Sequence, residues 1–233
     1  EQRDAAIAAL RRMLEIAPDA FDARQHLRRM LTERVAPWHF AMMNDERRNR
    51  AYQEALERAV TPESHVFEIG TGSGILAMLA AQAGAGRVTT CEANPLIAEV
   101  AAENVAANGL ADRVTVIPRP SWNLDLARDL GGRADILVAE ILSDTLLDEG
   151  ILRITEHARR EFLTPDARLI PYAVSAMTRL VGGDAVASTT RVETVSGFDL
   201  SAFNRFTPAS ISLNTDSREI ITFSEDLEVF RFD

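Results

Sequence analysis

The sequence lacks the residues from which several kinds of site are built. Its 233 residues include one cysteine, Cys91, and four histidines, which excludes an internal disulfide and leaves no Cys/His cluster with zinc-ligand spacing. It has no apolar run of the roughly 18 residues that a membrane-spanning helix needs, and no signal-peptide pattern. We therefore expect a cytosolic, metal-free protein without a membrane segment. Because the chain begins with Glu1 and not with Met, we also expect it to be a fragment.

Positive charge is also in short supply. The chain has 25 lysine and arginine residues against 35 aspartate and glutamate residues, a formal net charge of -10. An acidic surface repels the phosphate backbone of nucleic acids, so a nucleic-acid partner is not expected. The same charge is compatible with a cationic peptide or a guanidinium compound, although it does not by itself identify one.

The first 36 residues predict a helical hairpin. Apolar residues recur with helical spacing on both sides of Pro18, and Asp19 is expected to cap the second helix. Two helices joined by such a turn have the form of one tetratricopeptide unit. A single unit has no period to compare, so an ordinary helical hairpin packed on a neighbouring domain is an equally good interpretation. From residue 37 to residue 60 we expect one charged amphipathic helix.

Residues 37–171 predict an α/β domain with a Rossmann-like, doubly wound sheet, because apolar strand patterns alternate with helical ones. The expected strands are residues 65–69, 87–91, 113–117 and 134–139. Helices are expected at 75–83 and, capped by Asn94 and Pro95, up to Asn108. The last segment, residues 172–233, is rich in β-branched and small residues without a helical period, and we expect a smaller all-β unit, a partial β-barrel. Its expected strands are residues 175–181, 211–213, 220–223 and 227–232.

A glycine-rich loop follows the first expected strand. Gly70, Gly72 and Gly74 can adopt positive φ angles and let backbone N–H groups at a helix N-terminus approach a ligand closely. Glu92 ends the second strand, 22 residues after Gly70, where a carboxylate can accept hydrogen bonds from both hydroxyls of a ribose. Together these features predict a nucleoside-binding site. The alternative is a tight strand-to-helix turn that binds nothing.

The spacing of the glycines distinguishes between two nucleoside cofactors. A dinucleotide fingerprint places its third glycine at position 75, where this chain has Ile75, and Gly74 comes one residue early. Glu68, just before the glycines, stands where a methyltransferase anchors its loop and faces the amino group of S-adenosylmethionine. The sequence therefore favours S-adenosylmethionine as the cofactor, with S-adenosylhomocysteine as its product.

Three segments resemble the protein arginine N-methyltransferases, and most of all the branch of arginine methyltransferases seven and nine. They are VFEIGTGSGIL (66–76), TCEAN (90–94) and AEILSDTLLDEG (139–150). The resemblance runs from about Trp38 to at least Arg179, and the ninth member carries tetratricopeptide repeats before its catalytic module. It implies transfer of a methyl group from S-adenosylmethionine to a guanidino nitrogen of arginine.

The resemblance also implies roles for single residues. Residues 38–52 are similar to the helix that this family folds over the bound cofactor, so Arg48 would bind the methionine carboxylate and Met42 would line the acceptor channel. Ser121 and Trp122 stand where the family often has a glutamate that meets the adenine amine. Adenine recognition there would depend on backbone groups or stacking, and we expect Trp122 in the core rather than as an adenine shelf.

Two carboxylates, Glu140 and Glu149, follow the fourth expected strand nine residues apart. A guanidinium is planar and carries five N–H donors, so two carboxylates can hold it by forked hydrogen bonds and can accept a proton after methyl transfer. The resemblance assigns this pair as the family's double-glutamate loop, and we therefore expect both to be catalytic. The alternative is that they are ordinary polar residues flanking a solvent loop.

Two departures from the family bear on the acceptor. Ser143 stands where the seven and nine branch tends to carry an aspartate, with Asp144 displaced by one position. A Thr-His-Trp loop expected in the β-barrel is missing, because no histidine follows His157. The expected acceptor is arginine in a protein or peptide, with free arginine or another small guanidino metabolite as the first alternative. The second alternative is an inactive, cofactor-binding interaction protein; a homodimer is compatible with each of these.

Overall fold

The computed structural model describes residues 2–143, 150–211 and 220–232 of the chain. Its contacts divide the chain into two compact units, Glu1–Tyr172 and Ala173–Asp233. Among the described residues, no helix is both long enough and apolar enough to cross a membrane.

The first unit contains a five-stranded sheet in the order β3-β2-β1-β4-β5. Its strands are β1 (His65–Ile69), β2 (Arg87–Cys91), β3 (Val114–Ile117), β4 (Ala134–Ala139) and β5 (Leu163–Ile170). All four pairings are parallel. The expected Rossmann-like α/β fold is confirmed, with the four expected strands in place. The fifth strand, β5, and the helix before it were not predicted.

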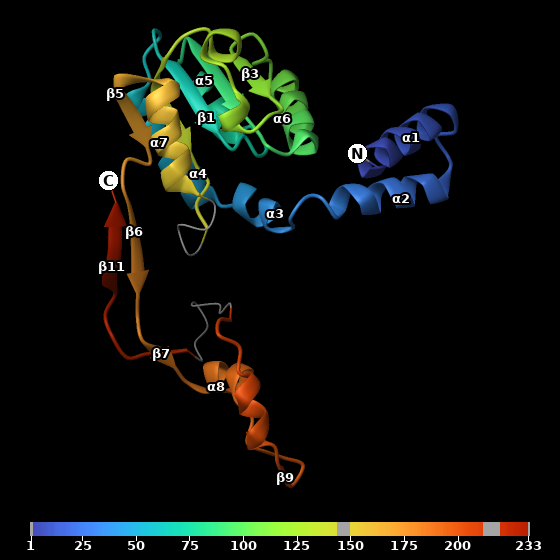
Figure 1. Ribbon diagram of the computed structural model, residues 1–233, viewed down its shortest axis with the longest axis vertical. Helices are drawn as coiled ribbons and strands as arrows, with labels where there is room; N and C mark the ends of the chain where they lie inside the picture. The colour runs from blue at the N-terminus through green and yellow to red at the C-terminus, as the bar shows by residue number, and fades with distance from the viewer. Residues whose placement is uncertain (1, 144–149, 212–219, 233) are drawn as a thin grey trace. The chain divides into compact units, whose positions relative to one another are not determined.

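Alternating residues of the strands pack on the two faces of the sheet. Val66, Ile136 and Val138 belong to one buried cluster together with Leu56 and Leu76 from the covering helices. On the strand β1 the next residue, Phe67, is fully buried, and its ring meets that of Phe162 edge-on, with centroids 5.5 Å apart. Because successive side chains of a strand point to opposite faces, both faces of the sheet are buried. Helices accordingly lie on both faces (Figure 1).

Up to α6, the helices of the first unit follow the expected order, with two corrections near the N-terminus. They are α1 (Gln2–Ile16), α2 (Phe21–Thr32), α3 (Trp38–Met43), α4 (Glu46–Ala59), α5 (Ile75–Gln82), α6 (Pro95–Ala107) and α7 (Ile151–Glu161). The single helix expected over residues 37–60 is wrong, because Asp45 accepts a hydrogen bond from the backbone N–H of Arg48 and starts a new helix. Asp19 does not cap α2 either; its N-cap is Ala20, with no side-chain hydrogen bond.

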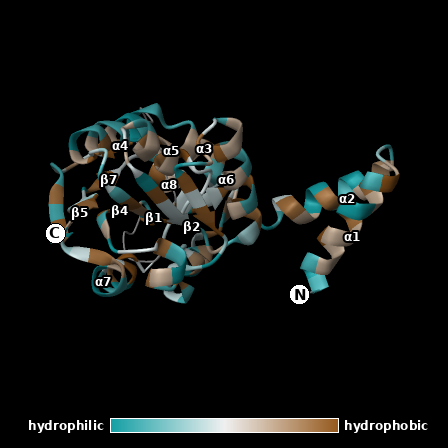
Figure 2. Ribbon diagram, turned by 90° about the horizontal axis from the view of Figure 1, so that it is seen from above, coloured by the Kyte–Doolittle hydropathy of each residue, from teal (hydrophilic) through white to brown (hydrophobic). Residues whose placement is uncertain are grey.

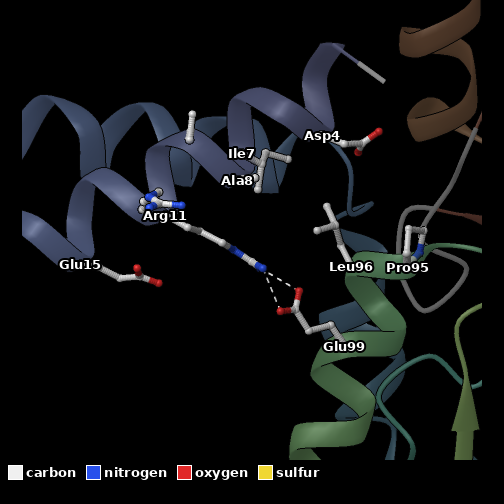
Figure 3. Close-up of a pocket in the computed structure, with 10 residues that line it drawn as sticks. Asp4, Ile7, Ala8, Arg11, Glu15, Pro95, Leu96 and Glu99 are labelled. Atoms are coloured by element: carbon white, nitrogen blue, oxygen red, sulfur yellow. Dashed lines mark hydrogen bonds and ion pairs between the residues drawn. The ribbon is translucent and has the colours of Figure 1, made fainter.

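The helical hairpin α1–α2 contacts the sheet domain through α6. Arg11 of α1 forms a bidentate ion pair with Glu99 of α6, with both nitrogen–oxygen distances 2.8 Å. A cavity of about 650 Å³ opens between these two helices, lined by side chains such as Ile7 and Leu96 (Figure 3). None of the residues predicted to bind the cofactor lines it. Both hairpin helices carry hydrophobic and hydrophilic residues along their length (Figure 2). Their tetratricopeptide-like character stays a prediction.

The second unit combines short antiparallel ladders with helical turns. Its ladders pair β6 (Val174–Thr178) with β11 (Leu227–Phe232), β7 (Val181–Gly182) with β10 (Ile221–Thr222), and β8 (Thr194–Val195) with β9 (Phe198–Asp199). The helix α8 (Asp184–Thr190) and the 3-10 segment η3 (Ser201–Phe206) also belong to this unit. The expectation of an all-β unit is therefore wrong for these helical segments. The strand expected at 211–213 lies largely outside the described residues.

A buried histidine at the start of β1 has a fixed tautomer. His65 is 7% exposed, and its Nδ1 lies 2.8 Å from Nη2 of Arg87 while its Nε2 lies 2.9 Å from the hydroxyl oxygen of Thr89. Because a guanidinium only donates, Nδ1 must accept and Nε2 carries the proton. Burial, followed by the charge of Arg87, lowers the pKa of His65 to about 4.

This histidine should make folding sensitive to acid. The unfolded chain protonates His65 near pH 6.5, so its contribution is fully present above that pH and is lost as the pH falls toward 4. We expect the free energy of unfolding to fall by about 2 kcal/mol less over this range in His65→Asn than in the native chain. Asn can still accept from Arg87 but does not titrate. Urea denaturation at several pH values measures the difference, and equal losses in both proteins would contradict the prediction.

Candidate functional site

The candidate site lies where three neighbouring strands end. Ile69, the last residue of β1, pairs with Cys91 at the end of β2 and with Ala139 at the end of β4. The next residues in the chain are the glycine loop, Glu92 and Glu140, which therefore follow the same edge of the sheet. The chain order reverses between β1 and β4, since β2 and β3 extend the sheet on one side and β5 on the other. Ligands of doubly wound sheets bind at such a switch point.

The glycine loop has the backbone that its composition predicts. Gly70, Gly72 and Gly74 all have positive φ angles, of 86°, 52° and 87°. The N–H groups of Gly70 and Thr71 donate to the carbonyl oxygen of Cys91, at 3.0 and 3.1 Å, which ties the loop to β2. A Cβ atom on Gly72 would meet no atom within 4 Å, so the loop borders open space at this residue.

Glu92 links the glycine loop to the start of α6. Its Oε2 accepts from the backbone N–H of Gly72 at 3.1 Å, and its Oε1 accepts from that of Asn94 at 2.9 Å. Each carboxylate oxygen has two lone pairs, so both can also accept a hydroxyl hydrogen. This placement suits the predicted contact with ribose hydroxyls, although Glu92 also has a structural role that the sequence did not reveal.

Glu68 is buried at the end of β1. It is 1% exposed, and its Oε2 accepts from the hydroxyl of Thr90 at 2.5 Å. Its Oε1 has no hydrogen-bond partner among the described residues. Burial, above all, raises the pKa of Glu68 to about 8. A buried acceptor without a partner is costly, and it is the kind of atom that a ligand satisfies.

The side chain of Arg48 extends from α4 to Glu140, at the same edge of the sheet. Its Nη2 donates to Oε2 of Glu140, and its Nη1 donates to Oδ1 of Asn49 at 2.9 Å. The guanidinium carbon lies 5.4 Å from the ring centroid of Tyr52. Burial raises the pKa of the Tyr52 hydroxyl. The side chains of Arg48 and Glu140 are 15% and 16% exposed. The Nε of Arg48 is buried and has no partner among the described residues.

The two atoms without partners match the two charged groups of an α-amino acid. An ammonium group needs an acceptor such as Oε1 of Glu68, and a carboxylate needs a donor such as Nε of Arg48. The open space at Gly72 and the carboxylate of Glu92 suit a nucleoside beside them. The residues present therefore fit S-adenosylmethionine, which combines an amino acid with a nucleoside. The metal-free expectation stays a prediction; the described residues hold no group of metal-ligating side chains.

The surroundings of the other predicted site residues, Met42, Ser121 and Trp122, say less about their predicted roles. Met42 lies on α3 and is partly buried. Ser121 is buried in the 3-10 turn η1 (Ser121–Asn123), but Trp122 in the same turn is 61% exposed. The expectation that Trp122 belongs to the core is therefore wrong, because the turn directs its neighbour Ser121 inward and leaves the indole outside. A stacking role for Trp122 stays a prediction.

The loop after β4 is only partly described. Glu140 is placed by the end of β4, and Ile141, Leu142 and Ser143 follow it in the described part. Glu149 and Asp144 lie outside the described residues, so the convergence of Glu140 with Glu149 stays a prediction. The partner that the structure gives to Glu140 is Arg48, which was predicted to bind the cofactor and not this carboxylate.

Two hydroxyl groups of the site were not predicted. The hydroxyls of Thr71 and Thr90 hydrogen-bond to each other, and Thr90 in turn donates to Glu68. The chain of bonds connects the glycine loop to the buried carboxyl. Thr90 lies next to Cys91 in a strand of apolar and β-branched residues, so the sequence indicated only that Thr90 belongs to a strand. Only its position opposite Glu68 in the parallel ladder gives it a polar function.

Comparison with known proteins agrees with this geometry. Residues 52–170, about half of the chain, match the family model of the ribosomal protein L11 methyltransferase (PrmA). The match covers the sheet domain and every element of the cofactor site from Glu68 to Glu140. By fold, site and this match, the chain belongs to the class of Rossmann-like, S-adenosylmethionine-dependent methyltransferases that this model represents.

Its sequence relatives narrow the assignment. The chain is 47% identical over 204 residues to the arginine N(omega)-methyltransferase of Streptomyces achromogenes subsp. streptozoticus, which covers 88% of this chain and 55% of that protein. It is 42% identical over 150 residues to protein arginine N-methyltransferase 7 of Drosophila grimshawi, covering 60% of this chain and 21% of the relative. The chain belongs to the protein arginine N-methyltransferase family, as its motifs predicted. It spans only about half the length, or less, of these relatives.

Solved structures of the same family share the fold. A Trypanosoma brucei PRMT1 enzyme-prozyme heterotetrameric complex with AdoHcy matches with a TM-score of 0.74 and 26% identity, over 87% of this chain and 63% of that one. Protein arginine methyltransferase 10 of Arabidopsis thaliana matches with a TM-score of 0.57 and 25% identity, over 74% of this chain and 53% of that one. The first of these structures contains the demethylated product of the predicted cofactor.

The open space at Gly72 yields a test of the cofactor site. Gly72→Ala should lower the free energy of unfolding by about 1 kcal/mol, the cost of a positive φ angle for alanine. It should also weaken S-adenosylhomocysteine binding about tenfold or more, because the methyl group occupies the space that the ligand needs. Gly109→Ala is the matched control, since Gly109 also has a positive φ, of 69°, and open space around it. Calorimetric titration with S-adenosylhomocysteine measures the affinity of both variants. Equal affinities for Gly72→Ala and Gly109→Ala would show that Gly72 does not border the ligand.

Proposed function

We propose that this protein transfers the methyl group of S-adenosylmethionine to an ω-nitrogen of arginine, in a protein or peptide acceptor. One observation carries the proposal: Glu140 already binds a guanidinium, that of Arg48, at the strand end that faces the cofactor site. The carboxylate is largely shielded from solvent, and its position beside the glycine loop brings an acceptor guanidinium next to a bound cofactor. An anionic acceptor would be repelled by it, and a neutral one would gain a hydrogen bond but no ion pair.

The described residues would hold the cofactor through its charged and hydroxyl groups. Glu92 would accept the ribose hydroxyls, Arg48 would donate to the carboxylate, and Glu68 would accept from the ammonium. S-adenosylmethionine supplies a methyl group on a positively charged sulfur, where a nitrogen lone pair can displace the sulfur in line. The residues of the chain must then hold one guanidino nitrogen in line with that bond.

Glu140 would act mainly by position. A carboxylate that binds one nitrogen of the guanidinium orients the plane of the group and draws positive charge toward that nitrogen, which leaves another nitrogen more nucleophilic. Holding two reacting groups in alignment contributes up to about 7–11 kcal/mol to lowering a barrier, so little further assistance is needed. After transfer the acceptor nitrogen carries an acidic proton, which a carboxylate can accept. Glu149, by resemblance, would supply the second carboxylate.

A second acceptor is favoured by a specific observation. The Streptomyces relative, the most similar of the proteins named above, is described as an arginine N(omega)-methyltransferase and not as a protein arginine methyltransferase. Free arginine or a small guanidino metabolite is therefore the alternative substrate. Glu140 recognises the guanidinium, which both acceptors share, so the site described above serves either.

The position of Glu140 can be tested by one atom's change. Glu140→Gln should reduce methyl transfer about a hundred- to a thousandfold. S-adenosylhomocysteine binding should stay within a few fold, because the amide oxygen of glutamine can still accept from Arg48 and the lost charge faces the acceptor. Glu99→Gln is the control, since it removes a carboxylate that also pairs with an arginine, Arg11, but outside the site. Transfer of labelled methyl groups and calorimetry measure the two effects. Parallel loss of both in Glu140→Gln would contradict the assignment.

The acceptor is identified by its product. We expect incubation with labelled cofactor to methylate either an arginine-rich peptide or free arginine, and mass spectrometry of the two reactions distinguishes them. The full-length protein is the sample of choice, because the chain spans only part of its relatives. Binding of S-adenosylhomocysteine without turnover of any guanidine would support an inactive, cofactor-binding protein instead.

Two further proposals concern the setting of the enzyme. We propose a cytosolic location, supported by the sequence pattern alone, and self-association into a homodimer. The Trypanosoma relative forms a heterotetrameric complex, which is compatible with association in this family. Light scattering of the purified protein measures its mass in solution.

A further inference from the structure

The most unusual group in the site is the carboxyl of Glu68. It is almost completely buried, and the hydroxyl of Thr90 donates to it, on Oε2, with a smaller contribution from the backbone N–H of Ala77. Its other oxygen, Oε1, contacts no donor in the described part of the chain. A buried carboxylate normally has a cation or several N–H donors around it, because the loss of hydration is unfavourable. Glu68 forms no ion pair with a described residue and has fewer donors than that.

The charged and titratable groups around it do not compensate a negative charge. They come from three elements: Arg48 and Tyr52 on α4, Cys91 and Glu92 at the end of β2, and Glu140 after β4. The cation among them, Arg48, donates to Glu140 and to Asn49 instead of to Glu68. The positive charge of Arg48 is therefore already paired with the carboxylate of Glu140. A further negative charge, on Glu68, would have no cation of its own and would be unfavourable.

The balance of these effects determines the protonation state. Burial raises the pKa of Glu68, and the charge of Glu92 raises it further, whereas the hydrogen bond from Thr90, the charge of Arg48 and the backbone N–H of Ala77 lower it. The resulting pKa of about 8 lies above neutrality. With Oε2 accepting from the hydroxyl of Thr90, Oε1 is the oxygen without a hydrogen bond, and a proton on the carboxyl is assigned to it.

We infer that Glu68 is a neutral carboxylic acid in the ligand-free protein, and that the α-ammonium group of the cofactor displaces its proton, with Thr90 as the positioning residue. This rests on the proposed function for the identity of the cofactor. The O–H bond at Oε1 breaks, the proton passes to a buffer base in the solvent, and the electron pair remains on Oε1. The resulting carboxylate accepts a hydrogen bond from the ammonium, so that the cofactor brings the cation that the pocket lacks.

The inference predicts that cofactor affinity depends on pH. Below the pKa of Glu68 in the free protein, each bound cofactor must release one proton, so the association constant falls about tenfold for each pH unit. Affinity should therefore rise steadily from about pH 6 to about pH 8 and then level off. Glu68→Gln removes the titrating group and should remove this dependence.

Calorimetric titration with S-adenosylhomocysteine measures the proton directly. At about pH 6.5, where the ligand's amine is protonated, the native protein should release about one proton per ligand, seen as a binding heat that varies with the ionisation enthalpy of the buffer. Glu68→Gln should release none. The native protein should also release none with 5′-methylthioadenosine, which retains the nucleoside and the sulfur but lacks the ammonium. The infrared spectrum of the ligand-free native protein should show the C=O band of a protonated carboxyl group, and the spectrum of Glu68→Gln should lack this band.

Thr90 provides a second, independent pair of variants. Because its hydroxyl lowers the pKa of Glu68, Thr90→Val should shift the rise in affinity to higher pH, whereas Thr90→Ser keeps the hydroxyl and should follow the native profile. A merely structural role for Thr90 would lower affinity equally at every pH. These two variants and the native protein complete the test should Glu68→Gln fail to fold.

The outcomes separate this inference from the proposed function. Absence of S-adenosylhomocysteine binding at every pH would overturn the proposed function, and the inference with it. Binding by the native protein with a heat that is the same in all buffers at about pH 6.5 would overturn the inference alone. A pH profile of Thr90→Val that coincides with that of Thr90→Ser would remove Thr90 from its positioning role.

Discussion

The register between β2, β1 and β4 is the constraint on which the site depends. Because Ile69 pairs with Cys91 on one side and with Ala139 on the other, the polar groups that follow each strand meet at one level of the sheet. A shift by one residue would turn each strand's side chains to the opposite face and would break the buried core that holds it. The apolar packing of both faces therefore fixes the positions of groups that are themselves polar.

Charge in this site is arranged around a shortage of cations. Arg48 is held between Glu140 and the ring of Tyr52, while Glu68 has no cation of its own. Both ligands of the proposed reaction bring positive charge, the cofactor through its ammonium and sulfonium and the acceptor through its guanidinium. The acidic character of the whole chain, with its net charge of -10, is thus matched at the site by carboxylates that are shielded from solvent. Selectivity for cationic ligands follows from local geometry more than from the overall charge.

The strands and the glycine loop could be predicted because their signals are local. Apolar runs bounded by glycines gave β1, β2 and β4, and Asn94 with Pro95 marked the start of α6. Short elements were not predicted. One of them, α8, is a seven-residue stretch rich in alanine, serine and threonine, without an apolar period. The break before α4 depends on the side chain of Asp45, which a long amphipathic pattern conceals.

Contacts between residues that are far apart in the chain could not be predicted from the sequence. Arg48 and Glu140 are 92 positions apart, and nothing in either neighbourhood indicates that they pair. The partners of Thr90 likewise depend on strand pairing and not on a motif. The exposure of Trp122 is a matter of how one 3-10 turn is oriented. Identification of the family supplied roles for several of these residues, but their hydrogen bonds had to come from the fold.

Asn94 gives the N-terminal hairpin a connection to the nucleoside side of the site. Its backbone N–H donates to Glu92, while its side-chain amide donates to the carbonyl oxygen of Arg34, at 3.0 Å, just after α2. A protein trimmed to the sheet domain would lose that acceptor and the clasp between Arg11 and Glu99 at the same time. The ends chosen for recombinant production would then alter the neighbour of the carboxylate that we propose binds the ribose. The hairpin therefore belongs with the sheet domain in any fragment meant for quantitative work.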